Sequence, residues 1–114
     1  MQTKPLIDWN TFSAIDMRVG TIIKAEIFEQ AINPSYKLTI DFGELGIKKS
    51  SAQITTLYKV DELINQQIIA VVNFPPKQIA NMMSECLVLG VIGDKKDVTL
   101  LQPQFKVKNG QKIG

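Results

Sequence analysis

Apolar and polar residues alternate along several stretches of the chain, a pattern typical of β-strands with one buried face. The predicted main strands cover residues 17–28, 36–42, 47–54, 67–74 and 86–92. In the first strand, the residues expected on the apolar face are Val19, Thr21, Ile23, Ala25 and Ile27. Gly20 within this strand indicates a bulge or a sharp coil. A turn at residues 93–96 predicts a hairpin into a further strand at 97–101.

Helical signals are short and few. Residues 8–15 predict one short helix, with Asp8 or Asn10 as the N-cap and with Phe12 and Ile15 facing inward. A second helical turn is expected at residues 61–64. Five main strands, a coiled first strand and few helices predict an all-β fold, a five-stranded barrel of the oligonucleotide/oligosaccharide-binding (OB) type. An SH3-like barrel or a small sandwich is the alternative. A length of 114 residues predicts a single domain over residues 1–114.

Residues 73–85 carry the most unusual mixture of side chains. Two consecutive prolines, Pro75 and Pro76, end the preceding strand because proline donates no ladder hydrogen bond. Polar and apolar side chains then converge on one segment between two apolar runs. Loops held by rigid strands often carry binding residues. We therefore expect this loop to lie outside the barrel and to contact a ligand.

The composition excludes several kinds of chemistry. The chain has no histidine and one cysteine, so zinc sites built from Cys and His, and histidine-based catalytic triads, are excluded. Cys86 lies in an apolar run and is expected to be a buried thiol. No pair of carboxylates has an evident acid–base environment, so we expect no enzymatic activity, no metal and no cofactor. The formal net charge is +2. No apolar run is long enough to span a membrane and no signal peptide is evident, so we expect a cytoplasmic protein.

Several motifs resemble one family. Residues 15–22 (I-D-M-R-V-G-T-I) resemble the D-I-R-V-G-x-I opening of tRNA-binding OB domains, which occur in methionyl- and tyrosyl-tRNA synthetases and as free-standing proteins. The stretches that look more like one branch, the CsaA-type export-related chaperones, are 41–43, 50–55, 73–79 and 84–90. The resemblance implies an OB barrel without enzymatic activity that forms a homodimer partly through its N- and C-terminal extensions. It also implies two binding roles, for tRNA and for unfolded or preprotein peptides.

RNA binding is the first hypothesis for the ligand, either tRNA or other structured or single-stranded RNA. Basic side chains would contact phosphates, and hydroxyl, amide and carboxylate groups would contact sugars or base edges. The candidate RNA-binding residues are Arg18, Lys48, Lys49, Ser50, Ser51, Gln53, Asn73, Lys77, Ser84 and Glu85. Strand alternation places only one of Lys48 and Lys49 on the binding side. Glu85 has an alternative role, capping a turn or pairing with Lys77, and Phe42 is expected in the core rather than stacked on a base.

Peptide binding is the second hypothesis. Apolar side chains in the 73–85 loop would line a groove, and methionine adapts to varied partners. The candidate residues are Phe74, Pro75, Pro76, Ile79, Met82 and Met83. In the alternative, Ile79 and one of the two methionines seal the end of the barrel. Phe74-Pro75 and Gln78-Ile79 stand where typical tRNA-binding domains carry Leu-Lys and Lys-Met, and the lost positive charges favour a chaperone whose RNA binding is weak or vestigial.

The C-terminal segment is apolar enough to form an interface. Exposing a large apolar side chain costs about 1.5–3 kcal/mol relative to full burial. Packing across a two-fold axis would avoid this cost. The candidate dimer-interface residues are Leu101, Phe105, Val107 and Ile113.

Overall fold

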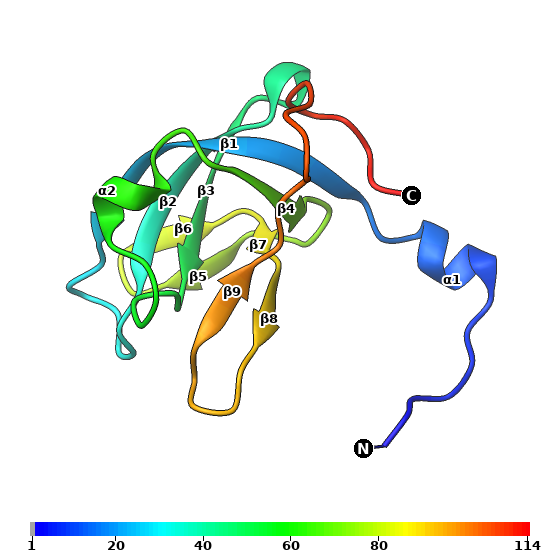
Figure 1. Cartoon of the computed structure of the whole chain (residues 1–114), viewed down its shortest axis with the longest axis horizontal. Helices are drawn as coiled ribbons and strands as arrows, with labels where there is room; N and C mark the ends of the chain where they lie inside the picture. Colours follow the sequence, from blue (N-terminus) through cyan, green and yellow to red (C-terminus); the bar gives the residue numbers. More distant parts are fainter. Residues whose placement is uncertain (1) are drawn as a thin grey trace.

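A five-stranded antiparallel sheet dominates the computed structural model, which describes residues 2–114 (Figure 1). Its strands are β1 (Met17–Ile27), β2 (Tyr36–Asp41), β3 (Ile47–Ala52), β4 (Gln67–Val71) and β7 (Leu87–Val88), in the spatial order β3-β2-β1-β4-β7. The edge strands β3 and β7 contact each other and nearly close the sheet into a barrel. The predicted all-β, OB-type barrel is therefore confirmed.

Short elements complete the chain. The helices are α1 (Trp9–Ser13), α2 (Val60–Leu63) and the 3-10 turn η1 (Gly43–Leu45). Two small hairpins pair β5 (Lys77–Ile79) with β6 (Met82–Ser84) and β8 (Gly90–Ile92) with β9 (Val98–Leu100). The predicted turn at 93–96 is confirmed, with the Gly93 N–H donating to the Asp97 carbonyl at 2.7 Å. The predicted fifth strand instead divides at Leu89, because β8 leaves β4 to pair with β9.

The alternation of buried and exposed residues predicted from the sequence holds along β2 but not along β1. Leu38 and Ile40 of β2 are fully buried, as is Phe42 directly after the strand, so the core placement of Phe42 is confirmed. In β1 the register shifts between Ile22 and Lys24. Ile22 therefore points into the core while Ile23 is 43% exposed, and the expected buried face at Ile23 and Ile27 is wrong. A bulge inserts one extra residue and so reverses which residues face inward.

Cys86 is buried beside this core, as expected from the sequence. Removal of the thiol from water raises its pKa to about 11, with smaller opposing effects from a hydrogen bond to Ser50 and from Lys48. Burial disfavours the thiolate because its charge loses hydration. Cys86 is therefore a packing residue in the neutral thiol form.

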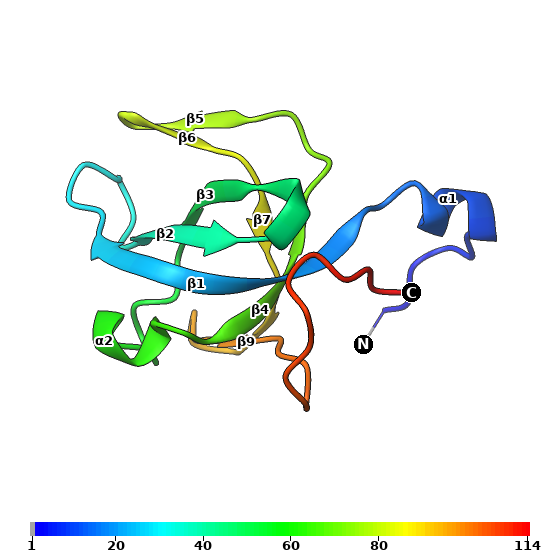
Figure 2. The same cartoon turned by 90° about the horizontal axis from the view of Figure 1, so that it is seen from above.

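Helix α1 projects away from the barrel (Figures 1 and 2). Asp8 is its N-cap and accepts a hydrogen bond from the Thr11 N–H at 2.8 Å. None of its residues is buried, and Ile15 beyond it is 45% exposed. The expectation that Phe12 and Ile15 face inward is wrong: Ile15 is exposed, and Phe12 is half-buried beside Trp9 and outside the core.

The C-terminal segment returns along β1 and pairs with it antiparallel through an isolated bridge between Arg18 and Lys112. The Gly110 N–H donates to the Val19 carbonyl at 2.7 Å, and the Ile113 N–H donates to the Met17 carbonyl at 2.9 Å. The Gln67 amide also fixes the segment, donating to the Val107 carbonyl at 2.6 Å and accepting from the Val107 N–H at 3.0 Å. The segment thus occupies the edge of β1 that β2 leaves open.

No helix within residues 2–114 combines the length and the apolar character needed to cross a membrane. Over the same residues, His, Cys, Asp and Glu side chains form no cluster suited to a metal ion.

Candidate functional site

The predicted loop at 73–85 is a β-hairpin that stands over the edge strand β3. Figure 2 shows β5 and β6 as a separate layer beyond β3. The hairpin pairs Lys77 with Ser84 and Ile79 with Met82, and Ala80 at its tip has a φ of 49°. Three-residue strands bound by prolines are too short for a periodic pattern, which explains why the sequence predicted a loop.

Hydrogen bonds to β3 fix the base of this hairpin. The Glu85 N–H donates to the Lys49 carbonyl at 2.7 Å, and the Lys49 N–H donates to Glu85 Oε1 at 3.0 Å. The Ser51 N–H donates to Ser84 Oγ at 3.2 Å. Ser84 and Glu85 therefore accept hydrogen bonds from backbone N–H groups of β3. Glu85 contacts Lys49, and the ion pairs among residues 2–114 do not include its alternative pairing with Lys77.

Ser50 does not reach the surface. Its side chain is 1% exposed, and its hydroxyl donates to the Cys86 carbonyl at 2.9 Å. Alternation along β3 points Ser50 into the barrel while Lys49 and Ser51 point outward. The placement of Ser50 among RNA-contacting residues is therefore corrected: it connects β3 to the start of β7.

A polar cleft of about 430 Å³ lies between the hairpin tip and the outer face of the sheet. Its lining residues are Glu26, Lys37, Leu38, Thr39, Lys49, Asn81, Met82, Met83 and Glu85. Thr39 lies opposite Lys49, and Lys37 opposite Glu26, in the strand register. Lys49 lines this cleft whereas Lys48, on the other face of β3, does not. The cleft combines two ammonium groups with hydroxyl, amide and carboxylate groups.

An apolar groove of about 670 Å³ lies on the other side of the hairpin base. Its lining residues are Ser51, Phe74, Pro75, Pro76, Lys77, Gln78, Ile79, Ser84, Cys86 and Leu87. Phe74 and Leu87 are 55% and 48% exposed, so apolar surface is available to a ligand. Four of the six expected peptide-contacting residues thus converge here.

The two methionines do not join that groove. Met82 is buried and Met83 is exposed, and both line the polar cleft instead. Gln78 and Ile79 of β5 line the groove, whereas their register partners Met83 and Met82 of β6 line the cleft. The two hollows therefore lie along different strands of the hairpin near its tip. The assignment of Met82 and Met83 to the peptide groove is therefore corrected: both belong to the polar cleft, and Met82 is buried there.

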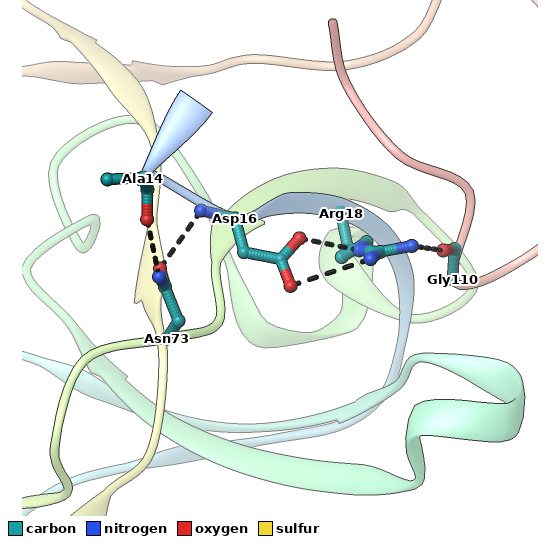
Figure 3. A network of polar contacts seen from close by, with 5 residues as sticks. All are labelled: Ala14, Asp16, Arg18, Asn73 and Gly110. Atoms are coloured by element: carbon teal, nitrogen blue, oxygen red, sulfur yellow. Dashed lines mark hydrogen bonds and ion pairs between the residues drawn. The ribbon is translucent and has the colours of Figure 1, made fainter. Parts of the chain in front are cut away.

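Arg18 and Asn73 line neither hollow. Figure 3 shows that both belong to one network of polar contacts with Ala14, Asp16 and Gly110. The Asn73 amide accepts from the Asp16 N–H at 3.0 Å and donates to the Ala14 carbonyl at 2.7 Å. Arg18 pairs with Asp16 at 2.6 Å and donates to the Gly110 carbonyl at 3.1 Å. Gln53 is exposed just beyond β3 and lines neither hollow.

Lys37 and Thr39 line the cleft and Leu87 lines the groove, although none of the three was predicted as a binding residue. Lys37 and Thr39 alternate with the buried Leu38 and Ile40, so strand periodicity already placed them on the outer face. In OB folds the second and third strands commonly provide that binding face. No pattern in the sequence marked Leu87 as exposed, because it lies in an uninterrupted apolar run that predicts a fully buried strand.

Apolar surface is also exposed on the terminal segments. Leu6 is 101% exposed and Trp9 79%, and a hollow of about 500 Å³ is lined by Ile7, Asp8, Trp9, Phe12 and Gly114. Of the four expected interface residues, Phe105 is 75% exposed and Leu101 37%, whereas Val107 and Ile113 are half-buried against the barrel.

Comparisons with known proteins match nearly the whole chain. A family model described as a putative tRNA-binding domain matches residues 17–112. The crystal structure of the chaperone CsaA from Bacillus anthracis has a TM-score of 0.92 and 51% identity, covering 96% of this chain and 100% of that one. The CsaA chaperone protein from Picrophilus torridus has a TM-score of 0.89 and 56% identity over the same shares.

A second kind of relative is much longer. Methionine–tRNA ligase from Chlorobium phaeovibrioides is 28% identical over 113 residues, which make up 99% of this chain and 16% of the ligase. The chain therefore spans about 16% of the length of the curated relatives that it matches first.

Proposed function

The chain belongs to the family of putative tRNA-binding domains, and from this premise we propose that it binds RNA of the tRNA class in the polar cleft beside the β5–β6 hairpin. The protein we propose is non-enzymatic, homodimeric and cytoplasmic, and similar in role to the CsaA chaperones. The observation that carries the RNA proposal is the pair of lysines, Lys37 and Lys49, on the outer face of β2 and β3. Backbone phosphates supply most of the affinity of RNA for a basic surface.

The remaining groups of the cleft suit nucleotide contacts. Thr39 and Asn81 offer a hydroxyl and an amide to sugar or base edges, and Met83 offers exposed apolar surface to a base. Glu85 Oε1 is occupied by the Lys49 N–H, which fixes the carboxylate and leaves its second oxygen for a base amino group. Open base edges of single-stranded ends and loops would fit such a cleft.

A salt titration of tRNA binding tests this proposal. Replacing Lys37 and Lys49 by alanine should weaken binding and reduce the slope of log K against log salt by about 0.7–0.9 for each lysine. The matched control replaces Lys95 and Lys96, which lie on the β8–β9 turn and line neither hollow. Equal losses in both double variants would show that general charge, and not the cleft, binds RNA.

Peptide binding is the second candidate, favoured by the apolar groove and by the similarity to proteins described as chaperones. An extended unfolded peptide would place apolar side chains between Phe74 and Leu87. Because Phe74 is only half exposed, its replacement by serine should weaken binding of an unfolded apolar peptide by about fivefold. Ile32→Ser changes a fully exposed apolar side chain outside the groove and is the control. Equal affinities for the native protein and both variants would reject the groove.

The homodimer would form through the exposed apolar residues of the N-terminal segment together with Leu101 and Phe105. Sedimentation equilibrium should give a dimer for the native chain and a shift toward monomer for the double variant Leu6→Ser, Ile7→Ser. Ile32→Ser removes another fully exposed apolar side chain and is the control. A native chain that sediments as a monomer would exclude the dimer.

A further inference from the structure

The side chain of Asn73 holds the segment that joins α1 to β1. Its amide makes two hydrogen bonds, both to backbone groups of this segment: it accepts from the Asp16 N–H and donates to the Ala14 carbonyl (Figure 3). The neighbouring Val72 N–H donates to the Asp16 carbonyl at 2.8 Å. Val72 and Asn73, just beyond β4, thus continue its pairing along residues 14–16 with strand-like hydrogen bonds. An asparagine amide can replace a backbone amide in this way because it carries both a donor and an acceptor.

We define the N-terminal arm as residues 2–15. Apart from the bond between Asn73 and the Ala14 carbonyl, no hydrogen bond of the described chain joins this arm to residues 16–114. No residue of α1 is buried, and hydrogen bonds of the arm are otherwise internal, such as the Thr11 N–H to Asp8 and the Ala14 N–H to the Asn10 carbonyl. Among residues 2–114, the bond from Asn73 Nδ2 to the Ala14 carbonyl is the only one that joins the arm to the rest of the chain. The direction of the arm therefore depends on this amide.

We infer that Asn73 is a positioning residue that sets the N-terminal arm against the C-terminal segment, and that it is not a ligand contact. The arm and the end of the chain flank a hollow of about 450 Å³ whose walls include Trp9, Phe12, Asn73 and Ile113. Asp16 extends the network to Arg18 and from there to the Gly110 carbonyl, so both walls are connected to the same point. Loss of the Asn73 amide frees the arm and widens this hollow.

The same residue begins the ligand loop. Phe74 follows Asn73 directly and forms one wall of the apolar groove. Arm and groove are thus connected through one residue. If the homodimer of the proposed function uses the arm, Asn73 also sets the dimer interface, and this extension rests on that proposed function.

Trp9 allows the arm to be observed directly, because it is the single tryptophan of the chain and lies in α1. Time-resolved fluorescence anisotropy of Trp9 reports local motion of the arm separately from tumbling of the barrel. Asn73→Ala removes both hydrogen bonds, whereas Asn73→Asp keeps an acceptor for the Asp16 N–H and loses the donor to Ala14. We expect faster local depolarisation in both variants, because each loses the donor to the Ala14 carbonyl. Asn33→Ala, which changes an exposed asparagine in the loop between β1 and β2, is the control and should match the native protein.

A dimer would restrain the arm from a second side, so the homodimer dissociation constant is measured on the same samples by sedimentation. Loss of the bond to Ala14 should then raise that constant by about fivefold, the change that corresponds to one hydrogen bond. Far-UV circular dichroism should show an unchanged barrel in the aspartate variant. Unchanged anisotropy together with an unchanged dissociation constant would overturn the inference. A weaker affinity for tRNA with an unchanged arm would also overturn it, since Asn73 would then be a ligand contact. Absence of tRNA binding in the native protein would refute the proposed function and leave the anisotropy result standing.

Discussion

Gly20 should not tolerate a larger side chain without a loss of stability, and Gly20→Ala tests how tightly the barrel wall is packed there. Gly20 lies in β1 opposite Ile68 of β4, with its missing side chain directed into the core. A Cβ built there would lie 2.6 Å from Ile40 Cγ2 and 2.7 Å from Phe42 Cε1. Ordinary contacts begin at 3.4 Å, so two fully buried side chains would have to move by most of an ångström.

The expected cost follows from this overlap. Adding a methyl group to a well-packed core costs about 1–3 kcal/mol. Replacing glycine by alanine also restricts the unfolded chain, which offsets about 0.4–1 kcal/mol. A net loss of about 1–2 kcal/mol remains, and for a domain of this size it should lower Tm by roughly 4–10 °C.

Thermal unfolding followed by circular dichroism measures that loss. Gly114→Ala is the control, because a Cβ at Gly114 would meet nothing within 4 Å. A double-mutant cycle with Phe42→Leu provides a sharper check, since leucine removes the ring atom that lies closest to the added methyl group. The two changes should then couple favourably by at least about 0.5 kcal/mol. An unchanged Tm for Gly20→Ala, or strict additivity with Phe42→Leu, would refute the reasoning.

Three further predictions concern single side chains. Cys86, whose pKa burial raises to about 11, should react with maleimide slowly near neutral pH and faster only as the pH approaches that value; rapid labelling of the folded protein at pH 7 would contradict its burial. Hydrogen bonds from Thr11 lower the pKa of Asp8 below its unfolded value near 3.8. The stability that the cap adds to α1 is therefore present above pH 3.8 and is lost as the pH falls through the folded pKa. An NMR titration that gives Asp8 an ordinary pKa would contradict this. Glu85→Ala should accelerate hydrogen exchange at the Lys49 N–H, which loses its carboxylate acceptor, and equal exchange rates in variant and native protein would show that the hairpin base is held by other contacts.

Alternation could predict those strands whose pattern is uninterrupted. Leu38 and Ile40 follow it through β2, and the sheet order of an OB barrel follows from five such strands. In β1 both Ile22 and Ile23 are apolar, so the sequence carries no mark of which one the bulge turns outward. The core face of that strand depends on tertiary packing, which overrides local pattern.

The candidate site was predictable in its location and less so in its roles. Residues 73–85 do lie outside the barrel, as their prolines and mixed polarity indicate. Asn73 has a different role because its partners are backbone atoms 57 and 59 residues earlier in the chain, which no motif encodes. Ser50 was misplaced for a simpler reason, since alternation along β3 already assigned it to the inner face.

The pairing of residues 110–113 with the beginning of β1 has a consequence for biosynthesis. Arg18 and Gly110 are 92 positions apart, and ribosomes add about 5–20 residues per second. One edge of β1 therefore stays unpaired for roughly 5–18 s until residues 110–113 have been synthesised. During that time its backbone N–H and C=O groups can hydrogen-bond to another chain. This edge of β1 can be covered only after residues 110–113 have been translated, so nascent copies on one polysome are most prone to pair with each other through it during that interval.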